Sequence, residues 1–129
     1  MNVRELTRFL YMSGINVLDY VDKVPDNFLY GAIQEGGKYD FIPGEFHIRE
    51  GIKELGFQSF KHCRFIKKIW LPSTLTHIQE NSLDSSWLKE IYYNGTKNDW
   101  KLKVTKGDKW CNISKLERII FTDDVVELN

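Results

Sequence analysis

The sequence has few of the residues on which enzymes and disulfide-stabilised domains depend. It contains 2 cysteines in 129 residues, Cys63 and Cys111, and they lie too far apart for a CxxC pair. We therefore expect two reduced thiols rather than a disulfide framework or a zinc site. A glycine-rich phosphate loop and a spaced pair of catalytic carboxylates are also missing. These absences predict no metal, no cofactor and no enzymatic activity.

An excess of charge of either sign is missing as well. Lysine plus arginine and aspartate plus glutamate number 18 each. Because basic residues are not in excess, we do not expect the protein to bind nucleic acid. No stretch approaches the length of an apolar membrane span, and charged residues interrupt residues 1–6, where a signal peptide would need an apolar core. We therefore expect a cytoplasmic protein that does not enter a membrane.

What the sequence does contain is a repeat. An apolar-x-apolar triplet recurs at nearly constant spacing, at 46–48, 69–71 and 91–93. The residues between the triplets match too, because Leu55 aligns with Ile78 and Ser59 with Ser82 at the spacing that separates the first two triplets. Repeats of this length are typical of leucine-rich-repeat solenoids, in which each unit buries its apolar face against its neighbours.

The repeat is less regular toward both ends. A fourth triplet, 119–121, follows the third after a longer interval, and residues 24–33 resemble a degenerate return segment in which Phe28 aligns with Ser59. Residues 34–44 are predicted to form an inserted surface loop. Residues 94–115 are predicted to form a modified return segment, since their apolar residues show no clear period.

The remaining residues are assigned to two caps. Val3, Leu6 and Leu10 form one helical stripe, and Asn16 can begin a second short helix, which predicts an N-terminal helical cap. A partner-binding amphipathic helix is the alternative for the same stripe. The expected fold is α+β: a leucine-rich-repeat solenoid of about four short coils, with a small parallel sheet and the N-terminal helical cap. The predicted division of this one folded domain is cap 1–23, solenoid 24–122 and C-terminal cap 123–129.

Three segments carry a resemblance to a known family. Gly-Phe-Gln-Ser-Phe-Lys-His-Cys at 56–63, Ile-Lys-Lys-Ile-Trp-Leu-Pro at 66–72 and Leu-Lys-Glu-Ile-Tyr-Tyr-Asn-Gly-Thr-Lys-Asn-Asp-Trp at 88–100 resemble the BspA-like leucine-rich repeat family. Its units end in an A-F-x-x-C arc and an I-x-I-P strand. The resemblance implies a parallel-stranded solenoid that binds proteins or surfaces, with no catalytic residues to carry over. Short members without export signals resemble proteins of phages and other mobile elements, which implies an intracellular target.

Alternation along the strands predicts one outward-facing row of side chains. The outer residues of each triplet point into the core, so the middle residue points away from it. These middle residues are His47, Trp70, Tyr92 and Ile120. Tryptophan and tyrosine are common anchors of protein interfaces, so we predict that this row binds a partner protein. The alternative is that the N-terminal cap or the 34–44 loop covers it.

Two further rows flank the predicted binding row. One consists of Glu45, Lys68, Glu90 and Arg118. It alternates in charge and either extends the binding surface or forms a cross-strand salt ladder. The other consists of Arg49, Pro72, Asn94 and Thr122. Within it, Arg49 is a predicted partner contact.

The sequence therefore predicts a protein–protein interaction module. The specific expectation is an intracellular inhibitor of a host protein, of an anti-defence type encoded by a mobile element such as a phage. The alternative is a surface or adhesin-type repeat protein or a structural fragment, and self-association through the strand face is a further expectation. An enzyme built on His62 and Cys63 is disfavoured, because adjacent side chains rarely face one another. His47, His62 and His77 are evenly spaced but out of step with the repeat, so we expect them on different faces.

Overall fold

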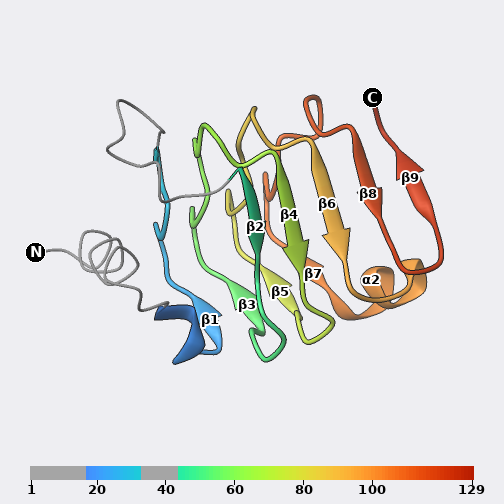
Figure 1. Ribbon diagram of the computed structural model, residues 1–129, viewed down its shortest axis with the longest axis horizontal. Helices are drawn as coiled ribbons and strands as arrows, with labels where there is room; N and C mark the ends of the chain where they lie inside the picture. Colours follow the sequence, from blue (N-terminus) through green and yellow to red (C-terminus); the bar gives the residue numbers. More distant parts are fainter. Residues whose placement is uncertain (1–16, 33–43) are drawn as a thin grey trace, which may run out of the picture.

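The computed structural model describes residues 17–32 and 44–129, which form two mostly parallel β-sheets and one α-helix (Figure 1). The narrow sheet contains β1 (Lys23–Val24), β3 (Glu54–Leu55), β5 (His77–Ile78) and β7 (Thr105–Lys106), in that order. The wide sheet contains β2 (Glu45–His47), β4 (Lys68–Leu71), β6 (Glu90–Tyr93), β8 (Arg118–Ile120) and β9 (Val125–Glu127), in that order.

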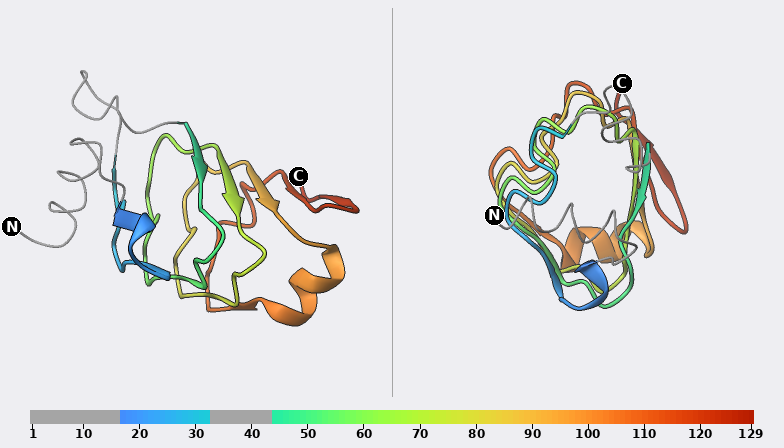
Figure 2. Two further views of the ribbon diagram at one scale, coloured as in Figure 1. Left: turned by 60° about the horizontal axis from the view of Figure 1, so that its bottom comes forward. Right: turned by 60° about the vertical axis from the view of Figure 1, so that its left-hand side comes forward.

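The chain alternates between the two sheets from β1 to β8, so each strand from β1 to β6 pairs with the strand two further along the chain. We call the run from one wide-sheet strand to the next a passage. Viewed along the row of strands, successive passages lie over one another (Figure 2, right). Parallel strands need such crossover connections, which here run through the narrow sheet. The coarse part of the fold prediction, a mixture of helix and mostly parallel strands, is thereby confirmed.

The strand register confirms the alignment of the sequence triplets. In the wide sheet Phe46 pairs with Ile69, Ile69 with Ile91 and Ile91 with Ile119. These four residues are 7% exposed or less and face the core, as the alternation predicts. Full burial of one such side chain stabilises a fold by about 1.5–3 kcal/mol. The buried first residues of the triplets therefore fix the wide sheet against the core.

The narrow sheet was not predicted as a sheet. Leu55 and Ile78, which the sequence repeat aligns, are both fully buried. They also pair with one another, and Leu55 pairs with Val24 on its other side. Val24 and Leu55 have the same separation in sequence as Phe28 and Ser59, so this pairing agrees with the predicted alignment of residues 24–33. These strands are two residues long, too short for alternation to distinguish strand from loop. The row of inward residues ends in Lys106, which pairs with Ile78.

A buried hydroxyl pair joins two passages beyond the narrow sheet. The Oγ atoms of Ser59 and Ser82 lie 2.8 Å apart, and both residues are 0% exposed. The Phe60 N–H donates to the Ser82 carbonyl at 2.7 Å. Each hydroxyl therefore has a buried partner, which removes the cost of burying it unpaired. The sequence alignment of these two serines is confirmed.

The prediction for residues 94–115 missed a helix. Helix α2 spans Lys97–Lys103, and Thr96 caps its N-terminus by accepting from the Asp99 N–H while the Asp99 carboxylate accepts from Thr96. Only Trp100 is buried among the helical residues, and Leu102 is 73% exposed. A single inward residue gives no apolar period, which explains why the sequence pattern did not reveal the helix.

Aromatic rings close the core beside α2. The Trp100 ring packs edge-on against Tyr93, Trp110 and Phe121, with centroids 5.0–6.0 Å apart. The Lys106 ammonium lies 4.8 Å from the Trp100 ring centroid, and burial lowers the pKa of this lysine. The ammonium thus lies over the rings, where a cation–π contact compensates part of its desolvation.

The structure describes the predicted C-terminal cap and only part of the predicted N-terminal cap. Residues 1–16 and most of the 34–44 loop lie outside the described residues. The second predicted short helix is a 3-10 turn, η1 (Val17–Asp19), followed by β1, so the structure does not support an N-terminal helical cap. The tail 123–129 contains β9, which pairs antiparallel with β8. In the described ranges, no helix is both long and apolar enough to cross a membrane.

Candidate functional site

The predicted binding row is assembled on the outer face of the wide sheet. His47 pairs with Trp70, Trp70 with Tyr92 and Tyr92 with Ile120, so the four side chains stand side by side. The His47 and Trp70 rings stack at 4.2 Å and 9°, and the Trp70 and Tyr92 rings stack at 4.3 Å and 7°. Strands about 4.8 Å apart bring rings in one register into such contact. We call these four residues the aromatic row.

The aromatic row is less exposed than the alternation predicts. His47 is exposed, whereas Trp70, Tyr92 and Ile120 are half-buried. The cause is the stacking itself, because each ring covers the face of the next. Trp70 is stacked on both sides, so it presents its edge to solvent rather than its face. A partner would therefore meet a ridge of ring edges, with the carbon-rich side chain of Ile120 at its end.

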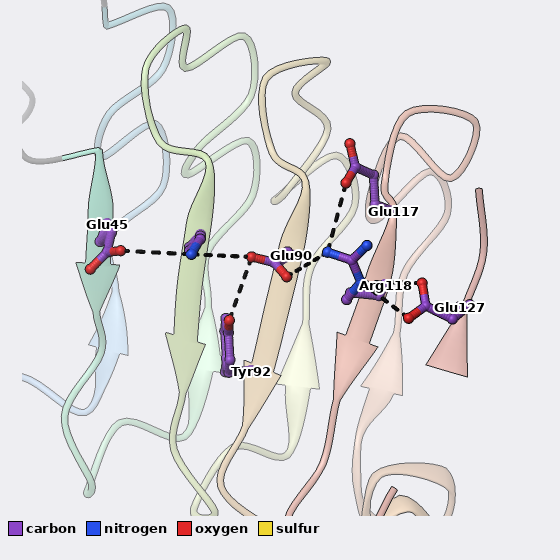
Figure 3. Close-up of polar contacts among 7 residues, drawn as sticks. Glu45, Glu90, Tyr92, Glu117, Arg118 and Glu127 are labelled. Carbon is purple, nitrogen blue, oxygen red and sulfur yellow. Dashed lines mark hydrogen bonds and ion pairs between the residues drawn. The ribbon is translucent and has the colours of Figure 1, made fainter. Parts of the chain in front are cut away.

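The charged row forms a ladder across the same strands (Figure 3). The Lys68 ammonium nitrogen lies 4.0 Å from a carboxylate oxygen of Glu45 and 3.4 Å from one of Glu90. Arg118 lies 2.7 Å from Glu90 and 3.1 Å from Glu127 of β9. The Tyr92 hydroxyl also contacts Glu90 at 3.4 Å. The hydrogen bond from Arg118, helped by Lys68, lowers the pKa of Glu90, and Glu90 in turn raises the pKa of Arg118.

This geometry matches the salt-ladder alternative for the charged row. Each of Lys68, Glu90 and Arg118 has partners of opposite charge within the sheet, and the Glu90 side chain is only 13% exposed. Charges that are already paired gain less binding free energy from a partner, because a new contact must replace an existing one. A role of the three residues in partner binding stays a prediction. Their established contacts link the neighbouring strands that carry the aromatic row.

Arg49, the remaining predicted contact residue, is exposed and makes hydrogen bonds within the chain. Its guanidinium donates to the Leu18 carbonyl at 2.7 Å, the Val21 carbonyl at 2.6 Å and the Glu50 carbonyl at 2.8 Å. These bonds tie the segment after η1 to the turn that follows β2. The structure therefore places Arg49 at a junction within the fold, and its contact with a partner stays a prediction.

Glu50 is a residue that the sequence analysis missed. Its carboxylate accepts from the Ser73 N–H at 2.8 Å, the Ser73 hydroxyl at 2.9 Å and the Asn94 side-chain amide at 2.8 Å. One carboxylate thus joins three successive passages. Burial alone would raise the pKa of Glu50, but the hydrogen bonds from Ser73 and Asn94 outweigh it and lower the pKa. The available signal was the spacing of Glu50 and Ser73, which is the same as the spacing of the first two triplets.

An open groove of about 360 Å³ lies between the aromatic row and the turns that follow the wide-sheet strands. Trp70, Tyr92 and Ile120 line it from the aromatic row. Glu50, Asn94 and Thr122 contribute polar side chains to its lining. The groove thus joins an aromatic surface to an ionised carboxylate. It occupies the face that the sequence predicts to bind a partner.

The cysteines and histidines do not gather into a reactive centre. Cys63 is buried, and burial raises the pKa of Cys111 to about 12, so its thiol stays protonated at neutral pH. His47 lies in the wide sheet and His77 in the narrow sheet, while His62 lies in neither. The expected separation of the histidines is confirmed. Across residues 17–32 and 44–129, no three cysteine, histidine or acidic residues come together to hold a metal ion.

Comparisons with known proteins add no family to this geometry. No protein-family model matches the chain, and no curated protein or solved structure matches it.

Proposed function

We propose that this protein is a non-catalytic interaction module that binds another protein through the outer face of the wide sheet. The aromatic row carries the proposal. Three stacked rings held in register form a rigid surface, and rigid aromatic side chains lose little conformational entropy when a partner packs on them. Half-buried tryptophan and tyrosine at the centre of a sheet face match the composition of the central residues of protein interfaces.

The other sheet supports a specific role for this row. The outward residues of the narrow sheet are Lys23, Glu54, His77 and Thr105, which are charged or polar. Lys23 and Glu54 form an ion pair at 3.1 Å there. The same chain thus covers one outer sheet face with polar residues. Folding alone does not require the aromatic residues that cover the other.

We further propose that the alternating sheets form a leucine-rich-repeat solenoid of about four coils. The parallel registers of the wide-sheet strands, which follow the sequence repeat, support it, as does the resemblance to BspA-like repeats. In such solenoids each unit contacts mainly its neighbours, and the stacked strands offer one continuous binding surface. The wide sheet would be that surface.

The proposed setting is the cytoplasm, and the proposed action is inhibition of a host protein by a product of a mobile element. The resemblance to short members of the BspA-like family supports this setting. An inhibitor needs a binding surface and no catalytic group, which agrees with the surface described above.

Affinity capture tests the proposed function. Tagged native protein and a Trp70→Ala/Tyr92→Ala variant would be incubated with a lysate of the host. We expect the native protein to retain a partner that the double variant releases. A Glu54→Ala/His77→Ala variant is the matched control, because it changes outward residues of the narrow sheet, and it should retain the partner. Equal capture by the Trp70→Ala/Tyr92→Ala variant would contradict the proposal, whether the partner is a host protein or a second copy of this chain.

A further inference from the structure

We infer that the groove beside the aromatic row receives a basic side chain, arginine or lysine, presented by the partner protein. This inference rests on the proposed function and adds the chemistry of the bound segment. Two features carry it: a carboxylate that no cation of residues 17–32 and 44–129 pairs at one side of the groove, and aromatic and aliphatic side chains at the other.

Glu50 is the only charged residue among those that line the groove. Three hydrogen bonds from Ser73 and Asn94 hold its carboxylate in place. Within the described residues it forms no ion pair, in contrast to Glu90 on the same sheet face. The neighbouring Arg49 guanidinium donates to backbone carbonyls instead. The groove therefore carries one fixed negative charge, which no cation of the described residues pairs.

The remaining lining suits the rest of a basic side chain. Trp70 and Tyr92 supply the carbon-rich edges of their rings, against which the stem of a long side chain can pack. Pro72 and Ile120 supply carbon surface, on which the methylene groups of arginine or lysine can pack while the charged end approaches Glu50. About 360 Å³ leaves room for one long side chain and its solvation.

Other occupants fit this groove less well. An acidic side chain or a phosphate would meet the Glu50 charge with like charge. A purely apolar side chain would remove water from the carboxylate without replacing the lost solvation, which costs several kcal/mol for a fully buried charge. The hydrogen bonds from Ser73 and Asn94 lower the pKa of Glu50, so the charge persists at neutral pH.

An NMR titration with a defined probe tests the inference. The probe is N-acetyl-arginine N-methylamide, and its neutral counterpart of nearly equal shape is the citrulline compound. We expect the arginine probe to shift the signals of Trp70, Tyr92 and Asn94 saturably at millimolar concentration. The citrulline probe should bind about tenfold more weakly, because it lacks the charge. Equal shifts with both probes, or shifts that do not localise to the groove, would overturn the inference.

Two variants separate the charge of Glu50 from a carboxylate charge elsewhere on the surface. Glu50→Gln removes the charge in the groove with little change in shape, and it should weaken arginine binding about tenfold. Glu54→Gln removes a carboxylate from the outer face of the narrow sheet, away from the groove, so it should bind arginine as the native protein does. Undiminished binding by Glu50→Gln would overturn the inference. The comparison of the two probes on native protein needs neither variant.

Failure of this inference is distinguishable from failure of the proposed function. If Glu50→Gln captures the partner as well as native protein while Trp70→Ala/Tyr92→Ala does not, strand-face binding stands and the basic-side-chain inference is wrong. If Trp70→Ala/Tyr92→Ala captures the partner normally, the proposed function is wrong, and the arginine titration still decides what the groove accepts.

Discussion

The two sheets have similar inner faces and different outer faces. Leu55 and Ile78 line the core from the narrow sheet, and Ile69 and Ile91 line it from the wide sheet. On the outside, the narrow sheet carries an ion pair and polar side chains, whereas the wide sheet carries the aromatic row and the groove. The inner faces are alike because both must exclude water from one core. The outer faces are free to differ, and we propose that their difference reflects partner binding by the wide sheet.

The largest expected effects come from the inner faces and should be similar in the two sheets. Ile78→Ala in the narrow sheet and Ile91→Ala in the wide sheet each remove a fully buried side chain. We expect each to lower the free energy of unfolding by about 2–5 kcal/mol, the sum of lost burial and a residual cavity. The loss of free energy of unfolding in each variant is measured by urea denaturation, followed by circular dichroism. A cost below about 1 kcal/mol for Ile78→Ala alone would show that the narrow sheet does not share the core.

Removing a hydroxyl of the buried Ser59–Ser82 pair should have a smaller effect on the free energy of unfolding. It measures a polar contact inside the core, for comparison with the polar contacts on the outer faces. Ser59→Ala or Ser82→Ala leaves one buried hydroxyl without its partner. Each single variant should lose about 1–2 kcal/mol of the free energy of unfolding. The double variant should lose less than the sum, since neither hydroxyl then remains unpaired. Additive losses in the same denaturation experiment would mean that the two hydroxyls are not coupled.

The outer salt ladder should contribute least, and its contribution should depend on pH. Glu90→Gln should lower the free energy of unfolding by about 0.5–1 kcal/mol at pH 7, as expected for a charge network at the surface. Folding lowers the pKa of Glu90, so the stabilisation is present above the ordinary value of 4.5 and is lost as the pH falls through the folded-state pKa. Denaturation of native and variant protein at several pH values measures this. A difference that grows toward acid would have the wrong sign.

The sequence predicted what depends on repetition. The alignment of Phe46, Ile69 and Ile91 is the observed register, because each burial position recurs at the repeat period. The same alternation placed Trp70 and Tyr92 on the outer face. It did not predict that they stack and cover one another, since side-chain torsions determine whether neighbouring rings stack or diverge.

What the sequence did not reveal depends on single contacts. Helix α2 begins at a capping box of Thr96 and Asp99, but one buried residue, Trp100, gives no helical period. Glu50 is an exposed polar residue, so the burial pattern does not single it out, and its repeat spacing to Ser73 does not by itself predict a hydrogen bond. The narrow sheet depends on backbone pairing of two-residue strands, which side-chain patterns do not encode.

The most direct measurement of strand-face binding is the affinity of the captured partner for three purified proteins. Native protein, Trp70→Ala/Tyr92→Ala and Glu54→Ala/His77→Ala would be compared by calorimetry after their folding is confirmed by circular dichroism. Loss of two central aromatic anchors should weaken binding by at least about 30-fold, equivalent to about 2 kcal/mol. The narrow-sheet variant should bind within about twofold of native protein. Similar affinities for native protein and Trp70→Ala/Tyr92→Ala, or a larger loss in the narrow-sheet variant, would contradict the account.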